Sequence, residues 1–319
     1  MSWLVTGGAG YIGAHVVRAL ADGGQDVVVL DDLSTGEASR VAGAKLVEGS
    51  VLNRGLVRRA IADNGVHGVV HIAAKKQVGE SVANPLGYWQ ENLTGLVDVL
   101  SVCREEGVDR FVFSSSAATY GLPDVDYVHE DTPCAPLSPY GETKLVGEWV
   151  LRDCAAAFGL RPMVLRYFNV AGAARPELGD PGAFNLVPLV FGALGKGERP
   201  QVFGDDYPTR DGTCIRDYVH VADVADAHVQ AARALDAGEP GQTYNIGRGE
   251  GASVLEVLAV IGEVTGLDVT HDVAPRRPGD PARVVAAVDR IRAGLGFQAR
   301  YGLRDMVASA WDAWRLRHP

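Results

Sequence analysis

The feature that most constrains this fold is the order of apolar runs and glycines in residues 1–32. The apolar run 2–5 predicts a buried strand, and helical periodicity across 15–21 is followed by a second apolar run, 27–30. Three glycines separate the first strand from the helix: Gly7, Gly10 and Gly13. The glycine spacing alone is a weak signal, but strand, glycine turn, helix, strand and terminal acid in this order are typical of a dinucleotide-binding unit.

The residue types in this turn fit the parts of a dinucleotide. Gly7 permits a tight turn, Gly10 lets the backbone approach a pyrophosphate, and Gly13 lets the helix pack close to the sheet. The pyrophosphate is expected at the positive end of the helix. Asp31, followed by Asp32, can accept hydrogen bonds from the adenosine ribose, and a carboxylate there repels a 2′-phosphate. The sequence therefore predicts NAD, and not NADP, as the cofactor.

Composition and charge narrow the classes of partner. The 319 residues are 47% hydrophobic and 22% charged, so they can bury a large core. A formal net charge of −10 argues against nucleic acid or an anionic membrane as the main partner. The four cysteines are scattered without metal-ligand spacing, so we expect reduced thiols and no metal site. Because no apolar run is long enough to span a membrane and the first strand begins at once, we expect a cytoplasmic protein without a signal peptide.

Strand and helix patterns alternate beyond the first unit. Apolar runs at 45–49, 68–72 and 110–116 predict strands, and periodic segments at 53–63 and 93–105 predict helices. This alternation is typical of α/β proteins with a Rossmann-like, doubly wound parallel sheet. Ligands of such sheets bind beyond the carboxyl ends of the strands. Three residues follow strand ends of this kind: Ala73, Lys76 and Ser116.

The regular alternation weakens in the second half of the chain. Glycine and proline become frequent from 172 to 212. We therefore expect 1–170 to form the NAD-binding domain, with 217–247 returning to it. Residues 171–216 and 248–319 are expected to form a smaller α/β domain that binds the substrate.

Three polar side chains have the arrangement that acid–base chemistry needs. Ser138 as N-cap and Pro139 as first residue predict the start of a helix. Tyr140 and Lys144 are four apart on that helix and project from one face. A phenol with a pKa near ~10 is a poor base at neutral pH, but a nearby ammonium and a charged nicotinamide ring lower that pKa. Lys144 can also hold the nicotinamide ribose, and Ser116 can bind the same substrate hydroxyl as the phenol.

These residues carry a resemblance to a known family. The turn at 6–13, the serines at 114–116 and the segment 140–144 together resemble the extended short-chain dehydrogenase/reductases. Further segments resemble the branch of that family that epimerises UDP-sugars at C4: 71–81, 165–169, 203–209, 211–218 and 274–280. The similarity covers nearly the whole chain.

The resemblance implies a role for each matching residue. The catalytic group would be Ser116, Tyr140 and Lys144. The residues near NAD would be Gly7, Gly10, Tyr11, Ile12, Gly13, Asp31, Asp32, Ser50, Val51, Ile72, Ala73, Lys76, Asn92, Tyr140, Lys144 and Tyr167. The residues near the UDP-sugar would be Ser116, Asn169, Asn185, Leu186, Arg216, Arg277, Asp280 and Val284. Arginines can clamp a diphosphate and a carboxylate can accept from a ribose, although each arginine taken alone is more typical of a surface ion pair.

The activity implied is the interconversion of UDP-galactose and UDP-glucose by transient, NAD-dependent oxidation at sugar C4, with Tyr140 as the base. Two positions depart from the family pattern. Ser50 stands where an aspartate usually contacts adenine, and Val284 stands where some members carry a tyrosine that narrows the sugar pocket. The alternative is therefore a related epimerase that acts on a UDP-N-acetylhexosamine or a UDP-pentose.

Two other classes of function are weaker candidates. The first is a nucleotide-sugar 4,6-dehydratase or a related decarboxylase. The dehydratases resemble this chain but carry an Asp-Glu pair where this chain has Ala117 and Ala118. Without that pair, loss of water from the sugar has no evident catalyst. A non-catalytic dinucleotide sensor has no need of Ser116, Tyr140 and Lys144 together. The cheapest discrimination is whether the NAD-loaded protein converts UDP-galactose.

The resemblance also implies a homodimer, formed by helices at 93–105 and 138–158. Both segments carry apolar side chains that could form an interface or belong to the core: Leu93, Leu96, Val97, Leu100, Val146, Trp149 and Val150.

Overall fold

The computed structural model describes residues 2–41, 43–182, 184–277 and 279–318. The chain divides into two compact units, each built from segments far apart in the sequence. The first comprises Met1–Gly121, Cys134–Arg166 and Ala225–Tyr244. The second comprises Leu122–Pro133, Tyr167–Val224 and Asn245–Pro319.

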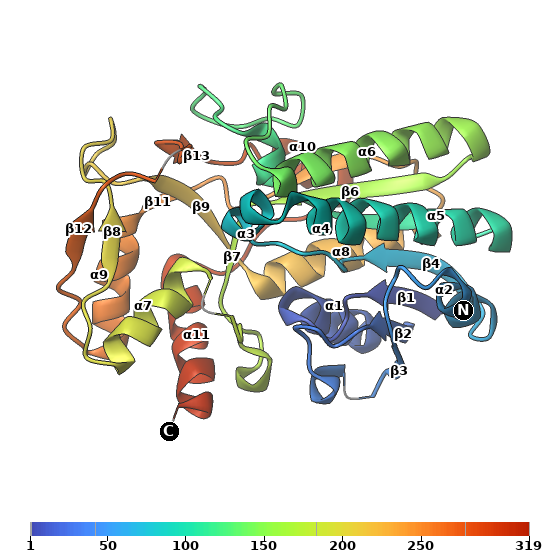
Figure 1. Cartoon of the computed structure of the whole chain (residues 1–319), viewed down its shortest axis with the longest axis horizontal. Coiled ribbons are helices and arrows are strands. Elements are labelled where there is room, and N and C mark those ends of the chain that lie inside the picture. The colour runs from blue at the N-terminus through green and yellow to red at the C-terminus, as the bar shows by residue number, and fades with distance from the viewer. Residues whose placement is uncertain (1, 42, 183, 278, 319) are drawn as a thin grey trace. The chain divides into compact units, whose positions relative to one another are not determined.

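A seven-stranded sheet with the order β10-β6-β5-β4-β1-β2-β3 organises the first unit (Figure 1). The strands are β1 (Ser2–Thr6), β2 (Asp26–Asp31), β3 (Lys45–Glu48), β4 (Val66–His71), β5 (Arg110–Ser116), β6 (Arg161–Tyr167) and β10 (Thr243–Ile246). Strand β1 pairs in parallel with β2 on one side and with β4 on the other, so the winding direction reverses beside it. The predicted Rossmann-like, doubly wound sheet is confirmed, and its ligand crevice lies beyond the carboxyl ends of these strands.

Helices cover both faces of this sheet. They are α1 (Tyr11–Asp22), α2 (Arg54–Ala62), α3 (Val78–Ala83), α4 (Pro85–Tyr88), a π-helical turn η2 (Trp89–Thr94), α5 (Gly95–Glu106), α6 (Pro139–Phe158) and α8 (Val221–Asp236), with 3₁₀ turns η1 (Ala38–Val41) and η3 (Ala117–Tyr120). Helices α5 and α6 run side by side, as Figure 1 shows, and with α2 they bury one core cluster against strand residues such as Leu4, Val28 and Phe111. Val29 alternates with Val28 along β2, and it lies with Val17 of α1 close to Gly8 on the opposite face.

Local signals placed some helix ends correctly and missed others. Ser138 caps α6 as predicted, because its hydroxyl accepts from the Gly141 amide at 3.2 Å and Pro139 is the first helical residue. The helix predicted at 93–105 is confirmed as α5, but α5 begins two residues later, because residues up to Thr94 belong to the π-helical turn η2. A π turn carries no periodicity signal of its own, and such turns are frequent at functional sites.

The second unit has smaller sheets and its own apolar core. Its strands are β7 (Asn169–Ala171), β8 (Gln201–Phe203), β9 (Ile215–His220), β11 (Gly251–Ser253), β12 (Asp272–Ala274) and β13 (Arg283–Val284), and its helices are η4 (Pro176–Leu178), α7 (Leu186–Gly195), α9 (Val254–Thr265), α10 (Asp289–Leu295) and α11 (Leu303–Arg317). Strand β9 pairs with β7, β11 and β13, and β8 pairs with β12. Side chains from α7, α9 and α11 form one core cluster around Phe191, Ile261 and Met306.

The segment that rejoins the first unit is shorter than expected. We predicted a return over 217–247, but strand β9 belongs to the four-stranded sheet of the second unit, and residues 225–244 are the part that rejoins. The glycine- and proline-rich stretch also contains the unpredicted helix α7. Pro188 is tolerated there because it lies in the first turn, where its missing amide hydrogen has no helical partner.

Candidate active site

The glycine turn after β1 has no room for a side chain at Gly7 or Gly13. A Cβ atom on Gly13 would lie 2.0 Å from the Gly7 carbonyl oxygen, and one on Gly7 would lie 2.7 Å from the Ala73 amide nitrogen. Gly7 also adopts φ +71°, which favours glycine. Gly10 caps α1 and brings no side chain that could accept from its first turn, which includes Tyr11 and Ile12. The first-turn amides of α1 are therefore not capped by a side chain of Gly10, and such a helix start fits the pyrophosphate of a dinucleotide.

Asp31 is fixed by backbone amides beside the same turn. One carboxylate oxygen accepts from the Ala9 amide at 2.8 Å, and the other accepts from the Leu33 amide at 2.9 Å. Burial raises the pKa of Asp31, and the two amide hydrogen bonds partly offset this effect. Asp32 is exposed and accepts from Ser34. The fixed oxygens of Asp31 keep lone pairs that can accept from ribose hydroxyls.

The π-helical turn holds the loop that follows β4. The Asn92 side chain accepts from the Lys75 amide at 2.7 Å, and it donates to the Lys75 carbonyl at 3.0 Å and to Thr143 at 3.1 Å. This loop also carries Lys76, whose ammonium lies 5.9 Å from the centre of the Tyr11 ring. Asn92 thus shapes a loop near the dinucleotide turn, a role that the sequence did not reveal.

The other predicted cofactor residues of the first unit follow strand ends. The amides of Ile72 and Ala73 both donate to the Thr6 carbonyl, at 3.1 and 3.0 Å, which joins the ends of β4 and β1. The Ser50 hydroxyl, beyond β3, accepts from the Leu52 amide at 3.1 Å, and Val51 is buried. Contact of these residues with NAD remains a prediction.

The three predicted catalytic residues come together. Ser116 ends β5, while Tyr140 and Lys144 lie one turn apart on α6, and the side chains of Ser116 and Tyr140 are hydrogen-bonded. The Lys144 ammonium donates to the Ser114 carbonyl at 2.8 Å. Tyr140 is 8% exposed and Lys144 is 3% exposed, so burial disfavours the charged form of each.

Burial dominates the titration of this group. It raises the pKa of Tyr140, and the hydrogen bond with Ser116 lowers it less. Burial also lowers the pKa of Lys144 to about 8, against the opposing charge of Glu148. The expected lowering of the Tyr140 pKa is wrong for the protein chain itself, because desolvation of the phenolate is the largest influence and raises that pKa. The contribution of a charged nicotinamide ring remains a prediction.

In the second unit, three predicted substrate residues lie together. Arg216 forms an ion pair with Asp280. Val284 of β13 is the register partner of Arg216 on β9, so the two side chains share one face of that sheet. The Arg277 guanidinium lies 3.8 Å from the centre of the Phe203 ring. Arginines can hold a diphosphate and a carboxylate can accept from a ribose hydroxyl, so the chemistry of these side chains fits the predicted ligand.

The remaining predicted residues of the second unit stand at the ends of its elements. Asn185 precedes α7 and donates to Asp180 at 2.7 Å, and Leu186 begins that helix. Asn169 begins β7 two residues after Tyr167, which is the last residue of β6. Their contacts with a ligand remain predictions.

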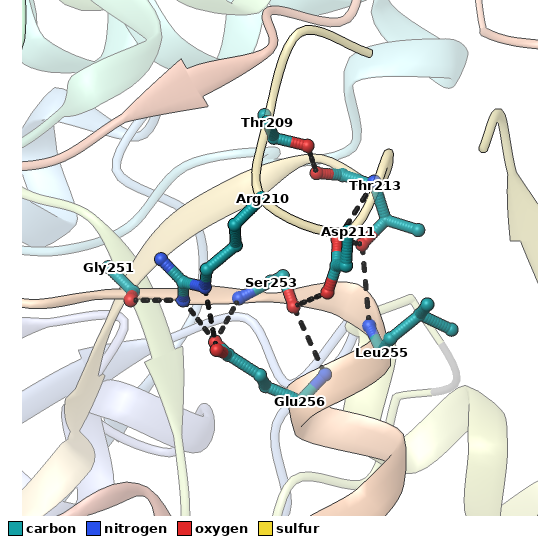
Figure 2. Close-up of polar contacts among 8 residues, drawn as sticks. All are labelled: Thr209, Arg210, Asp211, Thr213, Gly251, Ser253, Leu255 and Glu256. Atoms are coloured by element: carbon teal, nitrogen blue, oxygen red, sulfur yellow. Dashed lines mark hydrogen bonds and ion pairs between the residues drawn. The ribbon is translucent and has the colours of Figure 1, made fainter. Parts of the chain in front are cut away.

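Figure 2 shows how the loop before β9 is anchored to the first turn of α9. Arg210 forms an ion pair with Glu256, and Asp211 accepts from the Ser253 hydroxyl. Ser253 and Glu256 also form the capping box of α9. These contacts fix the chain just ahead of Arg216. The Ser-x-x-Glu signal before an apolar run was present in the sequence and could have revealed this anchor.

Neither a metal site nor a membrane-spanning helix is found among the described residues. No group of three or more histidine, cysteine, aspartate or glutamate side chains is placed to hold a metal ion there. Across the same residues, none of the helices combines the length and the apolar character that crossing a membrane requires.

The fold and the catalytic group define a class of protein. The model of the NAD dependent epimerase/dehydratase family matches residues 3–247, and the chain belongs to this family. It is 46% identical over 317 residues to the UDP-glucose 4-epimerase of Azospirillum brasilense, which covers 98% of this chain and 91% of that protein.

Solved structures agree with this assignment. A crystal structure of a UDP-glucose 4-epimerase is 42% identical and has a TM-score of 0.96, covering 100% of this chain and 98% of that chain. The UDP-glucose-4-epimerase of Stenotrophomonas maltophila, solved with NAD and formylated UDP-arabinopyranose, is 40% identical with a TM-score of 0.96. That match covers 100% of this chain and 99% of the other.

Proposed function

We propose that this protein is an NAD-dependent UDP-sugar 4-epimerase that interconverts UDP-galactose and UDP-glucose. The observation that carries the proposal is the group formed by the buried Tyr140 and Lys144 with the half-buried Ser116 at the end of β5. It lies in the same unit as the glycine turn, where a Cβ atom on Gly7 or Gly13 would clash with the backbone. The similarity to UDP-glucose 4-epimerases over nearly the full chain supports the same activity.

The protein residues divide the work of binding and proton transfer. Gly7, Gly10 and Asp31 would hold NAD, which when bound accepts a hydride from sugar C4 and returns it. Tyr140, as the phenolate, takes the proton of the sugar 4-hydroxyl, and the Lys144 ammonium stabilises that phenolate. Ser116 donates to the sugar 4-oxygen and keeps it beside Tyr140.

Epimerisation also requires the sugar to turn over within the site. In the proposed mechanism Arg216 and Arg277 bind the diphosphate and Asp280 accepts from the uridine ribose. The 4-keto sugar stays tethered by its UDP, presents its other face, and recovers the proton from Tyr140. No net oxidation results, so we expect NAD to remain bound between turnovers.

The direct experiment is incubation of the NAD-loaded protein with UDP-galactose and chromatography of the products. We expect UDP-glucose to appear until the two sugars reach equilibrium. Absence of conversion by folded, NAD-loaded protein would favour a dinucleotide sensor, and a 4-keto-6-deoxy product would favour a dehydratase.

Val284 is the proposed determinant of sugar size. Valine leaves more space than tyrosine next to the Arg216–Asp280 pair, so we expect measurable epimerisation of UDP-N-acetylglucosamine in addition to the main hexose activity. The Val284→Tyr variant should lower kcat/KM for UDP-N-acetylglucosamine relative to UDP-galactose by about 10- to 100-fold. Val284→Ile is the matched control, because it changes the side-chain volume little and should leave the ratio near its wild-type value.

Either of two results would remove this role of Val284. One is a wild-type protein with no activity on the N-acetylated sugar, and the other is an unchanged ratio in Val284→Tyr. High activity on a UDP-pentose, whose sugar lacks C6, would instead support UDP-pentoses as the substrate class. The Stenotrophomonas structure was solved with a ligand of this class, formylated UDP-arabinopyranose.

A homodimer through α5 and α6 is the proposed assembly. Of the apolar residues on these helices, Leu96 and Leu100 are buried in the core, whereas Val97 is 41% exposed and Trp149 is 48% exposed. A second copy would cover these side chains. We expect a dimer by light scattering and a monomer for Trp149→Glu, with Leu316→Glu on α11 as an exposed control. A monomeric wild type would contradict the assembly.

We propose the cytoplasm as the location and the metabolism of galactose as the setting. Free thiols at all four cysteines support a reducing compartment. The proposed substrates, UDP-galactose and UDP-glucose, support the metabolic setting.

A further inference from the structure

A buried carboxylate lies one helical turn beyond the catalytic lysine. Glu148 follows Lys144 by four residues on α6, and its side chain is 8% exposed. It accepts from the Ser115 hydroxyl at 2.5 Å and from two nitrogens of Arg166, at 2.9 and 2.5 Å. Arg166 is equally buried, and it also donates to the Tyr120 hydroxyl at 2.9 Å. The proposed acid–base chemistry uses neither charge.

The charges around Lys144 come from four elements of the first unit. The titratable groups that face it or its partners are Tyr140 and Glu148 on α6, His71 on β4, Arg166 on β6, and His228 on α8, which is hydrogen-bonded to Ser114. Burial and the charge of Lys144 lower the pKa of His71 to about 3, so this histidine is neutral. Glu148 is therefore the anion of this group near Lys144, while Arg166 is a second cation.

We propose that Glu148 is a positioning residue, resting on the function proposed above, that keeps Lys144 as an ammonium ion beside Tyr140 by balancing the buried charge of Arg166. The Glu148–Ser115 hydrogen bond also ties α6 to β5, the strand whose Ser114 carbonyl accepts from Lys144 and whose last residue is Ser116. The Glu148 carboxylate thus both favours the ammonium form of Lys144 and holds α6 and β5, which carry the catalytic residues, together.

The sign of the effect follows from the charges. Without the carboxylate, Lys144 loses the negative charge that favours its ammonium form, while the positive charge of Arg166 remains. Burial already lowers the pKa of Lys144 to about 8, so a further decrease brings its deprotonation into the neutral range. Loss of the ammonium removes the partner of the Tyr140 phenolate, and activity falls as pH rises.

The test is the pH dependence of kcat in NAD-loaded Glu148→Gln with UDP-galactose as the substrate. We expect the basic limb to move to lower pH by about one unit, while KM changes little. The matched control is Glu142→Gln, the same change on the same helix two residues before Lys144, where side chains do not face each other. Its basic limb should coincide with that of the wild type.

A second variant covers the case in which Glu148→Gln does not fold, because removing one partner of a buried ion pair is strongly destabilising. In Glu148→Gln/Arg166→Met both charges are absent. The pH of the basic limb should lie between the values of the wild type and of Glu148→Gln. If Glu148→Gln does not fold, the basic limb of the double variant should still lie at a lower pH than that of the wild type. A basic limb unchanged from the wild type in the folded variant, accompanied only by lower thermal stability, would show a purely structural role and overturn the proposal.

A direct titration separates this proposal from the proposed function. In protein labelled with ¹³C at the lysine ε carbons, the Lys144 signal is assigned by its loss in Lys144→Met. Its midpoint should be lower in Glu148→Gln than in the wild type whether or not the protein epimerises UDP-galactose. An unchanged midpoint overturns the role of Glu148, whereas a lowered midpoint in a protein without epimerase activity refutes only the proposed reaction.

Discussion

Replacing Tyr140 with phenylalanine should lower kcat for UDP-galactose by a factor of about 10²–10⁴, the usual contribution of a positioned acid–base group. The substitution removes only the phenol oxygen, which is hydrogen-bonded to Ser116 in a buried site. The ring remains, so packing on α6 is kept. We therefore expect the bound NAD content and the affinity for UDP to stay near their wild-type values.

The measurements are the initial rate of epimerisation, the NAD content of the purified protein, and UDP binding by calorimetry. Tyr127→Phe is the matched control, since Tyr127 is 46% exposed and takes no part in the proposed chemistry. Near-wild-type turnover in Tyr140→Phe would show that another group moves the proton. Loss of NAD together with turnover would point to a role in binding.

Replacing Lys144 with alanine should lower both the rate and the retention of NAD. The ammonium is expected to stabilise the Tyr140 phenolate and to hold the nicotinamide ribose, so one substitution removes both functions. It also leaves the buried Ser114 carbonyl without its donor, which now lies at 2.8 Å. We expect a loss in kcat of about 10²-fold or more and a clear decrease in NAD per protein chain after gel filtration.

Lys144→Met separates charge from packing in this prediction. Methionine fills most of the space of the lysine side chain but carries no charge, so it should lose turnover to a similar extent while keeping the fold. A bound-NAD content equal to that of the wild type in both variants would contradict the dual role of Lys144.

The parts of the structure that the sequence predicted depend on neighbours in the chain. The turn with Gly7 and Gly13 was visible because its strand, helix and terminal acid follow within some thirty residues, and the start of α6 at Ser138 was visible because a cap acts over three residues. Tyr140 and Lys144 share a helix face by spacing alone. The family resemblance then supplied the substrate residues, which no local pattern would have selected.

The parts that escaped prediction depend on pairings over long distances in the sequence. Arg216 forms an ion pair with Asp280, 64 residues away in the sequence, and Asn92 donates a hydrogen bond to Thr143, 51 residues away. The spacing of Glu148 from Lys144 on α6 was visible, but its partner Arg166 lies on strand β6, so the charge balance of Glu148 could not be inferred. Burial around Tyr140, which reversed the expected direction of its pKa, is likewise a property of the assembled fold.

The central claim is tested most directly with UDP-galactose that carries deuterium at sugar C4. The NAD-loaded protein is incubated with this substrate without added cofactor, and the products are analysed by NMR and mass spectrometry. We predict UDP-glucose that keeps the deuterium at C4, because the hydrogen that leaves C4 is returned to it within one active site. Recovery of unchanged UDP-galactose, or UDP-glucose whose C4 deuterium has been replaced by hydrogen from water, would contradict the proposed epimerisation.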